Sequence, residues 1–342
     1  MTESEFRKDI VSGEWVLVAG GIKKKPNFLA IKKPKASKRN CPFEENRIND
    51  ENPILWTPKL GVKNSEDISS WFLQVVPNKF PILTPHNACP LPESNGPYQS
   101  MIGVGFQEVV ITRYHDRSLA LLSNEEVFLV LDAYISRYRS LMKEACVEYI
   151  LIFHNHGPTA GATVGHPHSQ ILALPIVPLD VSRSLKGSEN YFKKYGKCAH
   201  CEVLKKELKD KKRVIIKNED FVVIAPFASH VSFETRIYPL RHGSNFEEVS
   251  SNEKKNLAKI MRETLAKIRN SMNDSDYNFF IHTAPVRSKN FKHYHWHIEI
   301  LPRTNIWGGV ELGSGTEVVK IPPEEAAEIL RKTSLPVRQA KV

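Results

Sequence analysis

The chain has 342 residues, of which 25% are charged and 41% hydrophobic, and its formal net charge is +10. This is an ordinary globular composition, which excludes a largely disordered protein. No run of about 18 apolar residues occurs, so the sequence predicts no membrane span or membrane partner. The N-terminal residues carry acids and lack the apolar stretch of a secretory signal, so we expect a cytoplasmic protein.

The positive charge is concentrated early in the chain, in Lys23–Lys25 and Lys32–Arg39. Such a segment suits anionic partners, either nucleic acid or phosphorylated small molecules, although a solvated basic loop is the simpler explanation. A zinc-stabilised RNA-binding module would also need aromatic residues between the basic ones, and this segment offers only Phe28. We therefore expect no nucleic-acid partner.

The two halves of the chain repeat one order of elements. In the first half, a strand over 108–114 leads to His115, a helix is expected over 123–145, and a strand over 149–154 follows. Ser123 and Glu126 form the pattern of a capping box at the start of that helix. A glycine-containing loop then leads to His166-Pro-His168-Ser-Gln170.

The second half has the same order. A strand over 233–241 leads to His242, a helix begins at 251, a strand covers 277–282, and His295-Trp-His297-Ile-Glu299 follows. The intervals from His115 to His166 and from His242 to His295 are 51 and 53 residues. Strand, helix, strand and His-x-His rarely align in this way by chance.

This order favours an α+β fold of two pseudo-repeats, each an antiparallel sheet with a long helix across one face. We expect the first half at 1–180 and the second at 197–335, with the boundary in the polar, Ser- and Lys-rich segment between them. A short helix over 322–329, with acids at its start, is expected near the end of the chain.

Two sets of residues have the chemistry of metal ligands. In the second half, Cys198-Ala-His-Cys201 can hold one ion with two thiolates, although a C-x-x-C pair alone could equally be a redox pair. With His242 and His295 it makes a Cys2His2 set suited to tetrahedral zinc. In the first half, the corresponding set is Cys41, Glu44, His115 and His166, in which Glu44 stands where a second cysteine is expected. We therefore expect one or two zinc ions, and the sequence does not distinguish zinc from iron at the second site.

The two remaining cysteines are Cys89 and Cys146. An odd total of five cysteines, in a chain without a secretory signal, argues against a disulfide framework. We therefore expect Cys146 to be a buried thiol in the predicted helical stretch and Cys89 to be a loop thiol.

The His166-Pro-His168 motif has a geometry suited to catalysis. In extended chain, side chains two residues apart project to the same side, so one imidazole can be held by a metal while the other faces a substrate. The preceding loop, residues 155–165, can offer backbone N–H groups to phosphate oxygens.

The motif His166-Pro-His168-Ser-Gln170, together with Cys41-Pro-Phe43, His115 and Asn155, resembles the galactose-1-phosphate uridylyltransferase family of the histidine-triad superfamily. The resemblance covers almost the whole chain, from Gly13-Glu-Trp15 onward. Its tail, residues 308–315, is similar to the branch of that family that includes ADP-glucose phosphorylases.

The resemblance implies a double-displacement nucleotidyl transfer from a nucleotide sugar to a sugar 1-phosphate or phosphate. His168 would attack the α-phosphate and form a covalent nucleotidyl-histidine, and Gln170 would hydrogen-bond the transferred group. The resemblance also implies a homodimer. The substrate-binding residues that it implies are Asn155, Gly161 and Thr163 at the phosphates, Asn78 and Phe80 at the nucleoside, and in addition Ser169 and Glu311.

His297 occupies the repeat position of His168, but we expect it to be structural. Gln170 is matched by Glu299, whose negative charge would repel an incoming phosphate. Lys289–His293 replaces the glycine-rich loop that precedes the first motif.

Several residues depart from the pattern of galactose enzymes. Ile22 replaces an arginine of the phosphate cluster, Val310 replaces a tyrosine next to Glu311, and Asn305 and Glu317 stand where a lysine and a glutamine are expected. These departures weaken the case for galactose 1-phosphate as acceptor. The leading hypothesis is a UDP-glucose:hexose-1-phosphate uridylyltransferase. An ADP-glucose phosphorylase, a dinucleoside polyphosphate hydrolase and a zinc-stabilised RNA-binding protein are the alternatives.

Overall fold

The structure is a computed structural model that describes residues 3–20, 37–48, 52–62, 67–86, 88–287 and 291–335. The basic residues 23–35, Ile22 and Lys289 lie outside these ranges. The first half contains β1 (Glu5–Lys8), β2 (Trp15–Val18), α1 (Glu45–Ile48), β3 (Leu55–Pro58), β4 (Trp71–Pro77), β5 (Glu93–Asn95), β6 (Tyr98–Ser100), β7 (Phe106–Thr112), α2 (Asn124–Leu141), β8 (Tyr149–His156) and β9 (His168–Leu174). The second half contains α3 (Leu179–Tyr195), α4 (Ala199–Asp210), β10 (Val214–Lys217), β11 (Phe221–Ile224), β12 (Thr235–Pro239), α5 (Ser251–Ser271), β13 (Tyr277–His282), β14 (His297–Pro302), α6 (Gly309–Ser314), β15 (Val318–Val319) and α7 (Pro323–Lys332).

One ten-stranded antiparallel sheet runs through both halves, in the order β10-β11-β12-β14-β13-β8-β9-β7-β4-β3. The order is symmetric about the β8–β13 pair, so each first-half strand of this sheet has a counterpart in the second half: β9 and β14, β7 and β12, β4 and β11, and β3 and β10. The α+β fold of two pseudo-repeats is therefore confirmed. The two antiparallel sheets are joined edge to edge, with Asn155 opposite Asn278.

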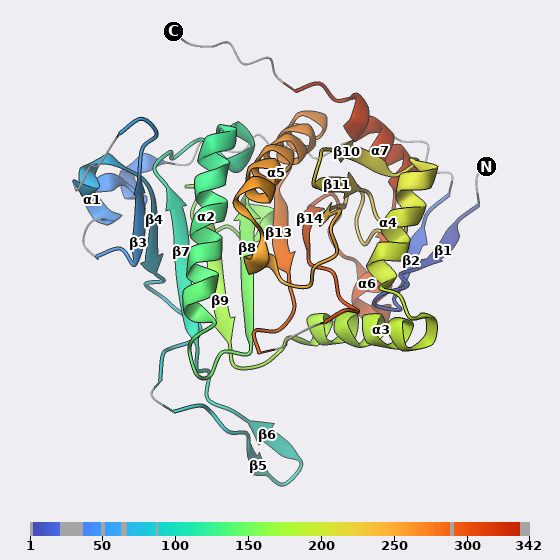
Figure 1. Cartoon of the computed structure of the whole chain (residues 1–342), viewed down its shortest axis with the longest axis horizontal. Coiled ribbons are helices and arrows are strands. Elements are labelled where there is room, and N and C mark those ends of the chain that lie inside the picture. Colours follow the sequence, from blue (N-terminus) through green and yellow to red (C-terminus); the bar gives the residue numbers. More distant parts are fainter. Residues whose placement is uncertain are drawn as a thin grey trace.

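The two long helices α2 and α5 lie side by side across one face of this sheet (Figure 1). Each helix begins with a capping box, formed by Ser123 and Glu126 in α2 and by Ser250 and Glu253 in α5. The first of these is the capping box that the sequence predicts. Apolar residues at alternate strand positions face these helices and form the main core, which includes Ile152, Ile171 and Phe279. Helix α2 ends at Leu141, four residues before the predicted end, because residues 142–146 form turns.

The opposite face of the sheet carries the polar side chains and two smaller apolar clusters. One cluster contains Val76 and Val109 beneath Ile48 of α1, and the other contains Ile224 and Tyr238 beneath Leu204 of α4. Since side chains alternate along a strand, His168 and Gln170 of β9 lie on this open face and Ser169 lies on the helix face. The candidate sites therefore share the face that α2 and α5 leave uncovered.

Cys89 and Cys146 form a disulfide, with their Cα atoms 5.1 Å apart. The prediction of two separate thiols, one of them in a helix, is wrong. Cys146 lies in the turn after α2, and Cys89 lies four residues before β5. The β5–β6 hairpin projects from the rest of the molecule (Figure 1). The two cysteines are 57 positions apart, so no local pattern reveals the contact.

In the described part of the chain, no helix combines the length and apolar character needed to cross a bilayer.

Candidate active site

His168 is the first residue of β9, and its ring is held in one orientation. Its Nδ1 lies 2.8 Å from the carbonyl oxygen of His166, so Nδ1–H donates and Nε2 keeps its lone pair. Burial lowers the pKa of His168, against an opposing contribution from this hydrogen bond. The imidazole is therefore neutral at pH 7, which is the form a nucleophile needs.

A cavity of about 550 Å³ opens over the side chains of His168 and Gln170. Its volume lies within the range of small-molecule sites. Asn78, Phe80 and Thr163, which the family resemblance assigns to the substrate, also line it. The other lining residues are Pro42, Phe43, Arg47, Ile48, Val76, Pro77, Lys79, Val109 and Val164.

Gln170 is oriented by a residue that the sequence analysis missed. Gln107 of β7 donates from Nε2 to Oε1 of Gln170 over 2.7 Å, and its own Oε1 accepts from the backbone N–H of Ile82 at 2.8 Å. The Gln170 NH2 group is thereby turned toward the cavity as a donor. No sequence signal marks Gln107, because the contact depends on strand register between β7 and β9.

The glycine-containing loop before the motif is held by the second half of the chain. Asp276 accepts hydrogen bonds from the backbone N–H and the hydroxyl of Thr159, at 2.7 and 2.6 Å. Gly157 has φ +84°, and a Cβ there would lie 2.0 Å from the Asp276 carboxylate, so only glycine fits. Asn278 donates to Oδ1 of Asn155 at 2.7 Å, which leaves the Asn155 NH2 group as a donor beside Gly161.

Four of the expected substrate residues are not among those that line the cavity over His168: Asn155, Gly161, Ser169 and Glu311. The Ser169 hydroxyl is on the helix face, where it accepts from Tyr134 at 2.5 Å and lies 2.9 Å from Nδ1 of His154. Glu311 lies on the exposed helix α6 and caps its own first turn, accepting from the Gly308 N–H at 2.9 Å. Neither side chain lines the cavity over His168.

The first predicted metal set is assembled. Ligand atoms of Cys41, Glu44, His115 and His166 all lie within 4.8 Å of one another. His166 uses Nε2–H to donate to the Thr112 carbonyl at 2.6 Å, so Nδ1 points at the other three residues. Nδ1 of His115 lies 2.7 Å from Oε1 of Glu44. A carboxylate can replace a thiolate in a four-coordinate site, and this geometry fits one ion.

The second predicted set is also assembled, at the start of α4. Sγ of Cys201 lies 3.2 Å from Nδ1 of His242 and 3.5 Å from Nδ1 of His295. A hydrogen bond from Cys201, with further ones from His242 and His295, lowers the pKa of Cys198 to about 2 against the effect of burial. A buried thiolate surrounded by such donors is the arrangement expected of a Cys2His2 metal site.

The second His-x-His motif differs from the first in its surroundings. His297 is only 4% exposed and stacks between Tyr238 and His282, with ring centroids 4.8 Å from each. Glu299 at the Gln170 position is ion-paired with Arg236 at 3.1 Å. His282, His297 and Glu299 form a further cluster of metal-ligand type that the sequence analysis did not identify. The buried ring of His297 supports the expected structural role.

The chain is similar to known proteins over almost its whole length. The family model described as "Galactose-1-phosphate uridyl transferase, N-terminal domain" matches residues 1–178, and the corresponding C-terminal model matches residues 184–336. ADP-glucose phosphorylase of Arabidopsis thaliana is 32% identical over 339 residues, covering 97% of this chain and 93% of the plant protein. Galactose-1-phosphate uridylyltransferase of Thermotoga maritima is 28% identical over 342 residues, covering 97% and 99%.

Solved structures give the same relationships. An ADP-glucose phosphorylase from Arabidopsis thaliana with bound ADP-glucose superposes with a TM-score of 0.80 at 30% identity, covering 98% of this chain and 100% of that chain. A structure described as a uridylyltransferase superposes with a TM-score of 0.73 at 28% identity, covering 96% and 97%.

Proposed function

This chain belongs to the galactose-1-phosphate uridyl transferase family and is a nucleotidyltransferase enzyme, and from this premise we propose that it transfers a nucleotidyl group through His168. The observation that carries the proposal is the neutral His168 ring, with Nδ1–H donated to a carbonyl and Nε2 available at the cavity. Imidazole held in this way is a nucleophile at pH 7.

In the first step, the Nε2 lone pair attacks the α-phosphorus of a nucleoside diphosphate sugar. A P–N bond forms, the bond from α-phosphorus to the bridging oxygen breaks, and sugar 1-phosphate leaves with that electron pair. In the second step, a phosphate oxygen of the acceptor attacks the same phosphorus and the P–N electron pair returns to Nε2. The hydrogen bond from Nδ1–H to His166 stabilises the charge that the ring carries in the intermediate.

The donors around His168 are placed to stabilise the transferred phosphoryl group. The side-chain oxygen of Gln170 accepts a hydrogen bond from Gln107, and that of Asn155 accepts one from Asn278. The NH2 group of each amide is therefore left to donate to phosphate oxygens. Preorganised donors of this kind are typically worth a factor of about 10²–10³ in rate.

For the substrates, we favour ADP-glucose as donor and inorganic phosphate as acceptor. This choice rests on the 32% identity to ADP-glucose phosphorylase and on the departures at Val310, Asn305 and Glu317 from galactose enzymes. Transfer from UDP-glucose to a hexose 1-phosphate is the second candidate, supported by the relative from Thermotoga maritima.

We further propose that the two metal sets hold zinc in a structural role, and that iron is the competing ion at the second. Cys41 and Glu44, with His115, would fix the segment beside the nucleophile motif, because His166 belongs to both the set and the motif. With four protein ligands in each set, no coordination position is left open for a substrate, so a bound zinc ion would stabilise the fold around it.

The functional unit we propose is a homodimer. Glu311 and its exposed neighbours Ile306, Val310 and Leu312 lie outside the cavity of their own chain. A partner copy could place them over the sugar, which would reconcile the position of Glu311 with its expected role. Analytical ultracentrifugation tests this, and a monomer at micromolar concentration contradicts it.

Intact-mass analysis tests the proposed function. The full chain is incubated separately with ADP-glucose, UDP-glucose and a GDP-sugar, and we expect the mass of one adenylyl group to be added from ADP-glucose. His168→Ala should show no adduct. A uridylyl adduct alone would select the second candidate, and no adduct with any donor would contradict covalent nucleotidyl transfer.

A further inference from the structure

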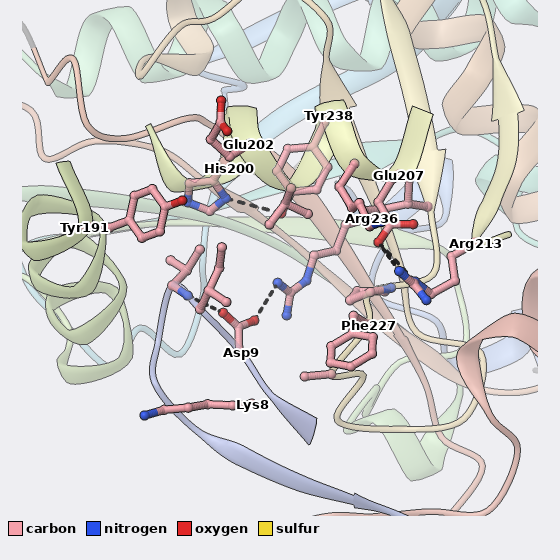
Figure 2. Close-up of a pocket in the computed structure, with 17 residues that line it drawn as sticks. Lys8, Asp9, Tyr191, His200, Glu202, Glu207, Arg213, Phe227, Arg236 and Tyr238 are labelled. Carbon is pink, nitrogen blue, oxygen red and sulfur yellow. Dashed lines mark hydrogen bonds and ion pairs between the residues drawn. The ribbon is translucent and has the colours of Figure 1, made fainter. Parts of the chain in front are cut away.

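A second cavity, of about 380 Å³, lies over the other half of the same sheet face (Figure 2). Its floor is the open face of β11 and β12, with Ile224, Arg236 and Tyr238. Its walls come from helix α4 and from the turn that follows β1, including Asp9. None of the residues lining it belongs to the site around His168.

This cavity is the internal-repeat counterpart of the one proposed to hold the nucleoside. In the first half, Val76 of β4 pairs with Val109 of β7, and both line the first cavity. In the second half, Ile224 of β11 pairs with Arg236 of β12, and both line the second. Because β4 corresponds to β11 and β7 to β12, the two cavities occupy the same place in the two repeats.

The flanking elements correspond as well. Asn78 and Phe80, just beyond the end of β4, line the first cavity, and Pro226 and Ala228, just beyond the end of β11, line the second. Helix α1 covers the first cavity through Ile48, and α4 covers the second through Val203. The fold therefore makes a cavity at the same place in both halves.

The charges of the second cavity disfavour a phosphate. Arg236 is paired with Asp9 at 3.4 Å, and Arg213 is paired with Glu207 at 2.6 Å (Figure 2). Arg236 is also paired with Glu299 at 3.1 Å. Lys206 is paired with Asp210 at 3.0 Å, and Lys8 at the rim lies over the Trp15 ring at 5.6 Å. The cations that line this cavity are thus already engaged.

Glu207 supplies an acceptor for a ligand. The residue is 2% exposed and lines the cavity, and Arg213 donates twice to its Oε1, at 3.0 and 2.6 Å. Its Oε2 is buried and has no hydrogen-bond partner among the described residues. A buried carboxylate oxygen without a donor is costly, and a ligand N–H or O–H would satisfy it once the carboxylate turns toward the cavity.

The one histidine among the residues that line the second cavity is His200, and both its ring nitrogens are engaged: Nε2 lies 3.5 Å from the Ser188 hydroxyl and Nδ1 lies 3.4 Å from the Tyr238 hydroxyl. Tyr238 lies on the floor and stacks on His297, the repeat counterpart of His168, which is not among the lining residues. A ligand here would therefore be bound and not converted.

We propose that this cavity is a second, non-catalytic nucleoside site, in which aromatic and apolar side chains hold the base and Glu207 accepts from an amino or hydroxyl group. The choice of a nucleoside as ligand rests on the proposed function of the first cavity. The existence of the second cavity and of its unpaired acceptor is independent of that function. Carboxylates commonly hold ribose hydroxyls in this way.

Equilibrium dialysis of the full chain with adenosine and with uridine tests the proposal. Val203→Trp narrows the second cavity and Val164→Trp, the matched control, narrows the first. We expect two equivalents of at least one nucleoside on the wild type, and loss of one equivalent in each variant. Glu207→Gln should weaken the second equivalent at least tenfold, and Val203→Trp should keep adenylylation of His168 by ADP-glucose.

Each outcome is informative. If Val203→Trp binds as many equivalents of nucleoside as the wild type, the proposed second site is wrong. Loss in Val203→Trp combined with no effect of Val164→Trp would uphold the second site and contradict the proposed first one. Circular dichroism shows whether Val203→Trp and Val164→Trp fold. Because the cations of the second cavity are already paired, AMP should bind there no more tightly than adenosine.

Discussion

Gln107 and Gln170 form a side-chain pair across β7 and β9, in which the Gln107 amide donates to the Gln170 oxygen at 2.7 Å. Gln107 also accepts from the Ile82 backbone at 2.8 Å, so its own amide cannot turn over without losing a bond. The pair fixes which end of Gln170 faces the cavity. Gln107 is thus a positioning residue for a side chain that would touch the transferred phosphoryl group.

Gln107→Leu should slow adenylylation of His168 about tenfold, because the Gln170 amide then loses its orientation. Single-turnover kinetics with ADP-glucose measure this, and the fall should appear in the maximal rate more than in the half-saturating concentration. The matched control is Gln99→Leu, on the exposed hairpin strand β6. Equal rates for the two variants would rule out the positioning role.

His168→Ala should abolish exchange of label between nucleotide sugar and sugar 1-phosphate while the fold remains intact. The reason is that the covalent intermediate needs the Nε2 lone pair. His168→Gly should regain some activity with an imidazole-based nucleotide donor, because removal of the ring opens space for it. The control is the exposed His86→Ala, which should keep full exchange. Substantial exchange by His168→Ala would reject this residue as the nucleophile.

Cys198→Ser should lose about one equivalent of bound metal and melt earlier than the wild type. Structural zinc contributes several kcal/mol to folding, and the Cys198 thiolate lies with Cys201, His242 and His295 at one point. Elemental analysis and a thermal melt measure the two effects. Cys89→Ser is the matched control, since it removes the disulfide and leaves both metal sets intact. If the wild-type protein contains no metal, the four residues of the second set only pack together and do not form a metal site.

The stabilising contribution of His230 should decrease as pH rises. Burial opposes the charged form, but the Glu317 carboxylate and nearby Glu234 raise the pKa of His230 to about 10. In the unfolded chain the value is about 6.5. The contribution is therefore complete below about pH 6.5 and is lost as pH rises through about 10.

The measurement is the free energy of urea unfolding at pH 6, 8 and 9.5. The difference between wild type and His230→Gln should be largest at pH 6, at roughly a few kcal/mol, and should shrink with rising pH. The exposed His86→Gln should show only a small difference at each pH. A difference for His230→Gln that grows with pH would contradict the raised pKa.

Phosphate or glucose 1-phosphate should resolve the nucleotidylated enzyme faster than galactose 1-phosphate does. The chain has Val310 and Asn305 where galactose enzymes carry a tyrosine and a lysine, and each missing hydrogen bond costs about 1–3 kcal/mol. Two such losses lower the galactose 1-phosphate rate by roughly 10²-fold or more. A single-turnover chase of the isolated intermediate compares the three acceptors. If galactose 1-phosphate is fastest, other residues compensate for these departures.

The sequence by itself determined the repeated order of elements and the residues of the motif proposed to carry the nucleophile. Local signals were sufficient here: the capping box at Ser123, the alternating strands, and the close spacing within Cys198–Cys201 and His166–His168. The similar intervals from His115 to His166 and from His242 to His295, of 51 and 53 residues, extended these signals to both metal sets, because each repeat folds by the same local rules.

Only the tertiary structure decided the remaining features. Pairing of β8 with β13 merges the halves into one sheet, and strand register places Gln107 on Gln170 and turns Ser169 to the helix face. The Cys89–Cys146 disulfide and the second cavity likewise join segments far apart in the chain. Such contacts arise from packing between elements, and a one-residue change of register would move each side chain to the other face.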